Sequence, residues 1–456
     1  MNTFRWIAAR KQLSPRAFKD ELNSQIWFSP LIYALFSVLL AALTLFLDYY
    51  CKLGEKVPSF FSINMDLTNT LVSTIMPGIL SITTFTFNLM LVVFTSFAAQ
   101  FSPRVLKNFA SSKSTQRILG IFMGSFLYTL FVFLFLNSSQ VDGYFAIPFA
   151  TTALSVFSAG TFVYFINHSV KWLQVNHMTQ SMKTESIKAI ETTIREELEV
   201  HRTQSAHNEP FSFPEGEKNP VYIQTSGYIQ TVNYSRLIDY AKEHNLVIKM
   251  EREVGDYVLD GTILFYYWNR DSAEQDEIDQ AIFHRYVHIG KSQTDIQDTT
   301  HIITKFVEMA IKSLGSDDFK TAINSIHQIS DILRKICDVS QFSSYLVDDS
   351  GVVRMVIPDK KFEDFLYDGF ANIRHYARRN IIITMELLKT LGNLAEAIGP
   401  AYYDDIWEFA VYTSQGFEEE YLFVQDKKYF LHILYDLAIS TEKEEQYEQI
   451  TKQMKK

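Results

Sequence analysis

Four long apolar segments lie in the first third of this 456-residue chain. They cover residues 30–47, 71–98, 118–136 and 144–166, and none of them contains an Asp, Glu, Lys or Arg. A helix needs about 20 apolar residues to cross the hydrocarbon core of a bilayer. The segments therefore predict four transmembrane helices within a membrane domain of residues 28–168.

Basic residues flank alternate ends of these segments. They precede the first segment, fill the connection between the second and third, and follow the fourth: Arg5, Arg10, Lys11, Arg16, Lys19, Arg104, Lys107, Lys113, Arg117, Lys171, Lys183 and Lys188. Positive residues near the spans are retained in the cytoplasm, so both termini are expected there. Residues 1–27, which include Trp6 and Trp27, predict an amphipathic cytoplasmic N-terminus at the inner membrane surface.

The rest of the chain predicts a large cytosolic region. Residues 169–207 keep helical periodicity and predict a stalk, which ends where Pro and Gly cluster over 208–220. Alternating residues predict a small β-domain over 221–269, and helical periodicity predicts a helical domain over 271–456. The chain should thus be a mainly α membrane protein with a cytosolic α+β region.

The β-domain contains one segment with a known likeness. Residues 255–264 resemble the Gly-Asp-x-Val-x-x-Gly-x-x-Leu element of the biotinyl and lipoyl barrel-sandwich family. The carriers of that family hold a modified lysine in a hairpin beyond the element, whereas here residues 265–269 contain no lysine. The likeness predicts a barrel-sandwich-like β-domain without a swinging prosthetic arm.

A wider resemblance rests on four motifs that stand in order along the chain: Gln100–Arg104, Tyr164–His168, Ser226–Val232 and Gly255–Val258. Together they resemble the bacterial predicted-membrane-protein family catalogued as domain of unknown function 2254. Residues 314–319 depart from the loop that this family tends to carry after a tail helix. The resemblance implies a fold and a bacterial plasma (inner) membrane, and it implies almost no biochemistry.

The second apolar segment is the most polar of the four. At 100° per residue its polar residues and its proline fall within an arc of about 80°. They are Thr74, Pro77, Ser81, Thr84, Asn88 and Thr95. An unsatisfied amide in hydrocarbon costs several kcal/mol, so this face must meet another helix or water. Two interpretations follow, helix packing and the lining of a pore.

Small residues in the third and fourth segments predict close helix contacts, within one subunit or between subunits. Gly120 and Gly124 form a small-xxx-small pattern, and Ala159 and Gly160 stand together. Because four spans make a thin bundle, an aqueous pathway would form on the axis of a homo-oligomer. Arg104, Lys107 and His168, at the expected cytoplasmic ends of the spans, are candidates for gating or lipid contact.

The segments' lack of ionisable residues argues against ion-coupled transport, so a passive or gated ion channel is favoured. The alternative is a non-conducting sensor or scaffold whose cytosolic domain binds a partner.

A net charge of −10 argues against nucleic acid as a partner. No catalytic motif predicts an enzyme, and no cofactor is expected. His284 and His288, four apart on an expected helix, lack a third metal ligand, so no metal site is expected either.

Overall fold

The computed structural model of the protein describes residues 28–58, 60–100, 112–136, 143–202, 211–270, 278–415 and 423–454. The chain is mostly helical and separates into two compact units. We call residues 28–178 the four-helix unit and residues 179–454 the α+β unit. The expected amphipathic N-terminus, residues 1–27, lies outside the described residues.

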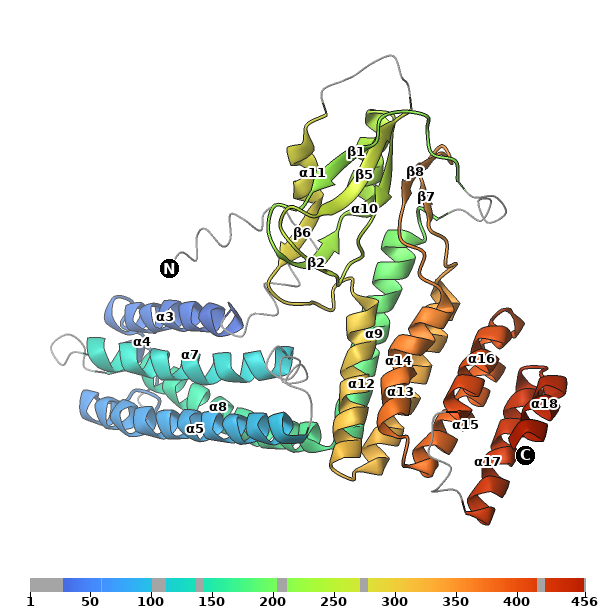
Figure 1. Ribbon diagram of the computed structural model, residues 1–456. Helices are drawn as coiled ribbons and strands as arrows, with labels where there is room; N and C mark the ends of the chain where they lie inside the picture. The colour runs from blue at the N-terminus through green and yellow to red at the C-terminus, as the bar shows by residue number, and fades with distance from the viewer. Residues whose placement is uncertain are drawn as a thin grey trace. The chain divides into compact units, whose positions relative to one another are not determined.

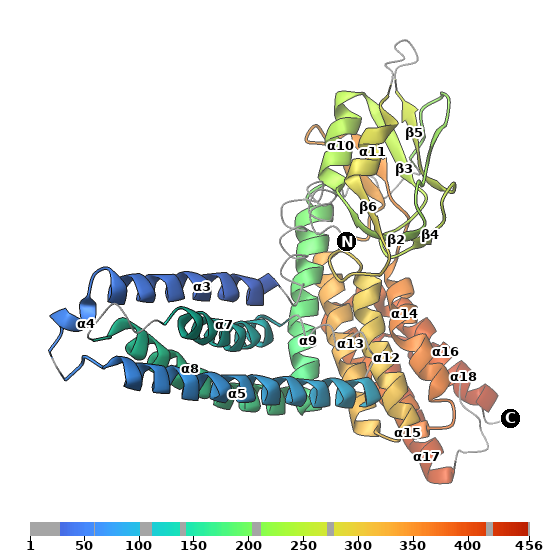
Figure 2. The ribbon, with the colours of Figure 1, turned by 90° about the vertical axis from the view of Figure 1, so that its left-hand side faces the viewer.

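The four-helix unit consists of long apolar helices that run side by side along a common direction (Figures 1 and 2). They are α3 (Phe28–Tyr49), α5 (Met65–Gln100), α7 (Lys113–Phe135) and α8 (Ala146–Leu173), and the short α4 (Leu53–Lys56) lies between α3 and α5. Each of the four is long and apolar enough to cross a membrane, which confirms the four helices predicted from the sequence.

Helix α7 is at the centre of this unit and packs against α3, α5 and α8. Half of its apolar stretch is buried, compared with 17–22% in the other three helices. A Cβ on Gly120 would lie 2.5 Å from the Tyr33 ring of α3, and one on Gly124 would lie 2.5 Å from Ser37 Oγ. The small-xxx-small pattern is therefore used within one chain, where it lets α3 and α7 approach closely.

The strands of the α+β unit form two small sheets (Figure 2). The five-stranded sheet has the order β1 (Asn219–Tyr222), β5 (Ile263–Asn269), β3 (Leu246–Met250), β8 (Val353–Val356) and β7 (Tyr345–Val347). The three-stranded sheet has the order β4 (Tyr257–Val258), β2 (Gly227–Val232) and β6 (Val287–Gly290). Helices α10 (Tyr234–Glu243) and α11 (Gln280–Tyr286) complete the shared apolar core.

These sheets reach beyond residues 221–269, the range expected for the β-domain. Strand β3 pairs in parallel with β8, with Ile248 opposite Met355. The five-stranded sheet therefore includes strands that lie about 100 residues later in the sequence than β3. The barrel-sandwich topology stays a prediction. The expected common helix for His284 and His288 is wrong, because α11 ends at Tyr286 and the next residues pair with β2 instead.

The segment expected as a stalk is helical and has two irregularities. Helix α8 ends at Leu173, and Gln174, with an extended backbone, separates it from α9 (Val175–Ile190). The chain then continues as a π-helix, η1 (Glu191–Leu198). Within the α+β unit this segment packs against α13 (Phe319–Val339), with Asn324 donating to Thr179 Oγ1 at 2.9 Å and Lys183 paired to Asp331 at 2.7 Å.

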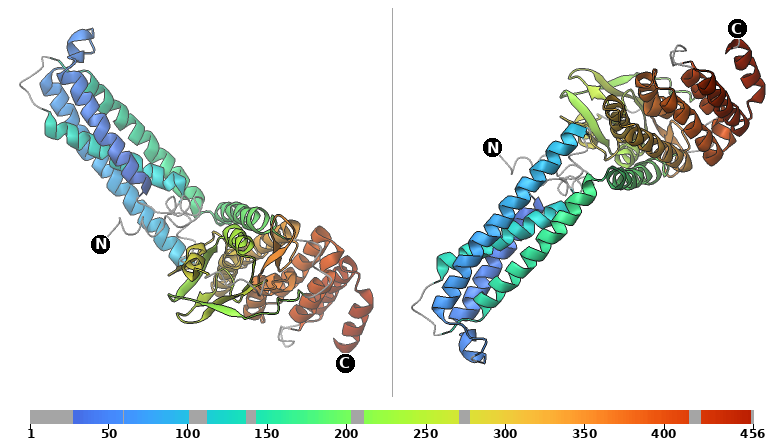
Figure 3. Two further views of the ribbon diagram at one scale, coloured as in Figure 1. Left: turned by 90° about the horizontal axis from the view of Figure 1, so that it is seen from above. Right: turned by 90° about the horizontal axis from the view of Figure 1, so that it is seen from below.

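The remaining helices form an array that follows chain order, and their colours pass from gold to red across it (Figures 1 and 3). Helices α12, α14 and α16 pack on one another in succession, and so do α13, α15 and α17, with α18 packed on α17. Their bounds are α12 Thr299–Gly315, α14 Phe362–Tyr376, α15 Ile381–Ile398, α16 Tyr403–Ser414, α17 Val424–Ser440 and α18 Glu444–Met454. Side chains of Asp298, Asp318 and Asn380 cap the starts of α12, α13 and α15.

Candidate functional site

The polar face of α5 lies on the outside of the four-helix unit. All six residues predicted for it are exposed: Thr74, Pro77, Ser81, Thr84, Asn88 and Thr95. The side of α5 that packs against the other helices carries a different set: Thr68, Val72, Ile79, Thr86, Met90 and Val93. Within the described part of the chain, the polar face therefore does not serve helix packing.

Most hydroxyl groups on this face bond to the backbone of their own helix. The Thr74 hydroxyl donates to the Thr70 carbonyl at 2.7 Å, and the Ser81 hydroxyl donates to the Pro77 carbonyl at 2.9 Å. The hydroxyls of Thr84 and Thr95 likewise donate to carbonyls of α5 at 2.9 Å. The Asn88 carboxamide has no hydrogen-bond partner in the described part of the chain, so this amide most strongly requires one from outside.

Pro77 adds a backbone acceptor to the same region of α5. Its ring nitrogen has no hydrogen to donate to the carbonyl of Ser73, one turn earlier. The next residue, Gly78, faces open space, because a Cβ placed there would have no neighbour within 4 Å. At the N-terminal end, Asp66 is exposed and follows the periodicity of the face. A carboxylate, backbone acceptors and an amide thus line one open side of α5.

The gating candidates fall in different places. Arg104 and Lys107 lie outside the described residues. His168 is half-buried in α8, with its Nε2 atom 3.4 Å from Thr115 Oγ1 of α7. Its ring stacks on Tyr164 and meets Trp172 edge-on. The structure therefore ties His168 to α7 and to its own helix.

Asp48, which was not among the residues predicted for a site, is fully buried. Helix α3 extends to Tyr49, beyond the apolar segment that ended at residue 47, and so includes this carboxylate. Oδ1 accepts from the backbone N–H of Phe145 at 3.2 Å and of Ala146 at 3.0 Å, and Oδ2 accepts from Ile147 at 2.8 Å. Asp48 thus caps the N-terminus of α8, where a negative charge is favourable.

The burial of Asp48 corrects the expectation that the membrane domain has no ionisable residue, which was drawn from the apolar segments alone. The apolar segments lack ionisable groups, but the unit they form buries one at its end. Because three backbone donors engage both oxygens of Asp48, its role is to hold α3 and α8 together. Other buried hydroxyls also pair across helices, with Thr44 and Tyr128 at 3.2 Å and Ser125 and Ser158 at 3.0 Å. An Asp directly after an apolar run was the available sequence signal.

The fold defines a membrane protein with four apolar helices, followed by an α+β unit. The chain belongs to the family of predicted membrane proteins DUF2254, whose model matches residues 23–393, as the resemblance implied. It is 25% identical over 307 residues to uncharacterized proteins of Mycobacterium tuberculosis and Mycobacterium bovis. The match covers 66% of this chain and 58% of those relatives, less than two thirds of their length. No solved structure matches the chain.

Proposed function

We propose that this protein is a homo-oligomer of the bacterial inner membrane that forms a passive or gated pathway for a small ion, lined by the polar face of α5. The observation that carries the proposal is the exposure of that face on the four-helix unit. Lipid tails offer no hydrogen bonds to Asn88, whereas water in a pore on the oligomer axis would. An oligomer with α5 on its axis also supplies the pathway that four helices alone would not.

The basic residues that flank the spans predict the orientation of this assembly. With both termini in the cytoplasm, the α+β unit would be cytosolic and could regulate the pathway, and the N-terminus of α5 would open to the outside. Asp66, exposed in the first turn of α5, would then give the oligomer a ring of carboxylates at the outer mouth. Such rings favour cations, so a small cation is the permeant ion that we propose.

A non-conducting sensor or scaffold is the second candidate. It is favoured by the hydrogen bonds of Thr74, Ser81, Thr84 and Thr95 to their own helix, since hydroxyls satisfied in this way can lie in a dry contact between subunits. In that case Asn88 would bond to its counterpart in the neighbouring subunit. The two candidates share the oligomer and differ in whether water reaches α5.

Ion flux from proteoliposomes distinguishes these functions. Asn88→Leu and Thr84→Leu place apolar groups on the polar face and should lower cation flux by about tenfold or more, since an apolar constriction excludes water. Phe87→Leu, on another exposed side of α5, is the matched control and should leave flux unchanged. Size-exclusion chromatography shows that each variant keeps its fold and subunit number. Absence of flux through the parent protein would favour the scaffold, and equal flux through Asn88→Leu would show that the polar face of α5 does not line the pathway.

A further inference from the structure

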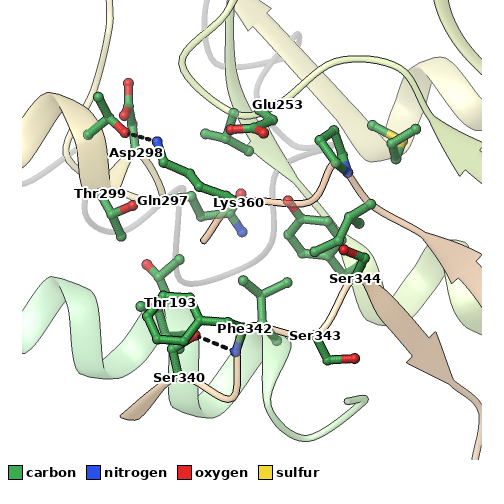
Figure 4. A pocket seen from close by; sticks show the side chains of 18 of the residues that line it. Thr193, Glu253, Gln297, Asp298, Thr299, Ser340, Phe342, Ser343, Ser344 and Lys360 are labelled. Carbon is green, nitrogen blue, oxygen red and sulfur yellow. Dashed lines mark hydrogen bonds between the residues drawn. The ribbon is translucent and has the colours of Figure 1, made fainter. Parts of the chain in front are cut away.

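The α+β unit contains a cavity of about 100 Å³ that is lined by both polar and apolar side chains. Its wall is made by η1, the end of β3 with the turn after it, the start of α12, and the segments before β7 and after β8. Figure 4 shows Glu253, Asp298 and Lys360 on one side of the view and Thr193, Ser340 and Phe342 on the other. A volume of this size accommodates a molecule of roughly five to ten non-hydrogen atoms.

Two backbone irregularities border this cavity. Thr193, Ile194 and Leu198 line it from η1, and π-helical turns frequently occur at functional sites. Phe342 lines it with a φ of 49°, in the left-handed region that bulky residues rarely adopt. Strained backbone of this kind persists where the surrounding structure enforces it, often at ligand sites. Both irregularities converge on the same cavity.

Asp298 brings an unpaired acceptor to the cavity wall. It is only 3% exposed, and its Oδ1 caps α12 by accepting from the His301 N–H at 2.7 Å. Its Oδ2 is buried and has no hydrogen-bond partner in the described part of the chain. Burial raises the pKa of this carboxyl to about 6. A buried carboxylate oxygen without a donor is costly in a native protein and indicates a missing partner.

Glu253 is a second carboxylate without a partner. Its side chain is half-buried and makes no hydrogen bond or ion pair among the described residues. Burial raises its pKa, and the charge of Lys360 opposes that rise. Lys360 itself is already paired with Asp368 at 3.3 Å and donates to Thr300. The two carboxylates thus leave room for a positively charged donor that the described chain does not supply.

Arg202 lines the cavity beside Ser340 and has an unpaired donor. It pairs with Glu199 at 2.5 Å and donates to Ser340 at 2.8 Å, while its buried Nε–H and the buried Oε2 of Glu199 have no hydrogen-bond partner in the described residues. Arg252 also lines the cavity, but it is exposed and can be hydrated. Two carboxylates and a guanidinium in the wall of one cavity suit a ligand with two kinds of polar group.

A metal ion fits this chemistry less well. Among the described residues no three His, Cys, Asp or Glu side chains lie close enough to hold one. Apolar groups also face the cavity, from Ile194, Met250 and Phe365. They suit the carbon atoms of an organic molecule.

We propose that this cavity binds a small zwitterion of the α-amino-acid class, with its ammonium group held by Asp298 and Glu253 and its carboxylate held by Arg202. The ammonium group supplies the donors that both carboxylates lack. The carboxylate supplies the acceptor that the Arg202 Nε–H lacks. This site is independent of whether the four-helix unit conducts ions.

Calorimetric titration of the full-length protein in detergent, with the standard L-amino acids one at a time, tests the proposal. At least one of them should bind, and the amine and the acid that each carry only one of its two charged groups should bind about tenfold or more weakly. Glu253→Gln should weaken binding by a similar factor. Glu251→Gln is the matched control, because Glu251 is exposed, pairs with Lys249 and does not line the cavity.

Three results would overturn the proposal. The first is that no amino acid binds to the folded parent protein. The second is that Glu253→Gln and Asp298→Asn, with their fold retained, bind as tightly as the parent. The third is that an amine without a carboxylate binds as tightly as the amino acid, which would remove the role of Arg202. Thermal unfolding of each variant confirms that a lost signal does not come from a lost fold.

Discussion

The two units each bury a carboxylate at the N-terminus of a helix, and they treat it differently. In the four-helix unit, Asp48 accepts three backbone hydrogen bonds from the start of α8. In the α+β unit, Asp298 accepts one from the start of α12 and keeps an oxygen without a donor. Both are almost completely buried, so burial alone does not distinguish a structural acid from a candidate binding residue. The number of hydrogen-bond donors that each carboxylate meets distinguishes the two.

Free energy explains why this difference matters. A hydrogen bond to a charged group contributes about 1.5–3 kcal/mol, and a buried charged group left without one costs at least as much. Asp48 should therefore stabilise the four-helix unit, whereas ionised Asp298 should destabilise the α+β unit when the cavity is empty. Proteins retain such unfavourable groups mainly where function needs them.

The largest effect is expected from Asp48→Ala. The substitution leaves two buried and one partly buried backbone N–H group at the start of α8 without an acceptor, so it should lower the free energy of unfolding by about 3–5 kcal/mol. Unfolding of the detergent-solubilised protein by sodium dodecyl sulfate measures this loss. Asp66→Ala, at an exposed position of α5, is the control and should change stability by no more than about 0.5 kcal/mol. Similar results for the two variants would contradict a capping role for Asp48.

Asp298→Asn should act in the opposite direction at neutral pH. The folded-state pKa of about 6 lies above the value of about 4 for an unfolded Asp, so ionisation of Asp298 penalises the folded state increasingly between pH 4 and pH 6 and fully above that. Asn keeps a side-chain oxygen to cap α12 and removes the charge. The variant should therefore gain up to about 3 kcal/mol at pH 8 and nothing near pH 4.

Unfolding of the full chain at pH 4, 6 and 8 measures that gain. A gain that does not change with pH would mean that the buried charge is not its source. A loss at pH 8 would show that the carboxylate already has a favourable partner in the folded protein.

The smallest effect on stability is expected from two glycines, one in tightly packed surroundings and one with open space beside it. Gly120→Ala places a Cβ against the Tyr33 ring and should cost about 1–3 kcal/mol, because α3 and α7 must separate. Gly160→Ala, on α8, meets nothing within 4 Å in one chain and should cost less than about 0.5 kcal/mol. Unfolding together with size-exclusion chromatography sharpens the contrast. Loss of the oligomer in Gly160→Ala alone would place this glycine between subunits.

Segment length and periodicity predicted the parts of the fold that depend on residues close together in the sequence. The apolar segments are long enough to fix four membrane-length helices, and periodicity alone grouped Thr84 and Asn88 on one face of α5. Strand β3 lies within residues 221–269, the range over which alternating residues predicted a β-domain. The pairing of β3 with β8 was beyond such reasoning, since it joins residues that are distant in sequence.

The sites could be predicted only in part for the same reason. The polar face of α5 is a property of one helix, whereas Asp48 meets its partners 97 to 99 residues later. The cavity combines Arg202, Glu253, Asp298 and Phe342 from four separate segments, and none of these segments carries a recognisable motif. A left-handed backbone at a phenylalanine, or an oxygen without a donor, becomes visible only when the chain is folded.

A change of the π-helix η1 to α-helical hydrogen bonding would rotate the residues that follow it. A π-helix accommodates extra residues in the turns of an ordinary helix, and each residue of an α-helix turns the chain by 100°. If one such residue were removed from residues 191–198, or absorbed by conversion to α-helical bonding, the turn after η1, residues 199–202, would rotate by about 100° relative to α9. Arg202 would then leave its place beside Ser340, so a shift in helical register alone could open or close one wall of the cavity.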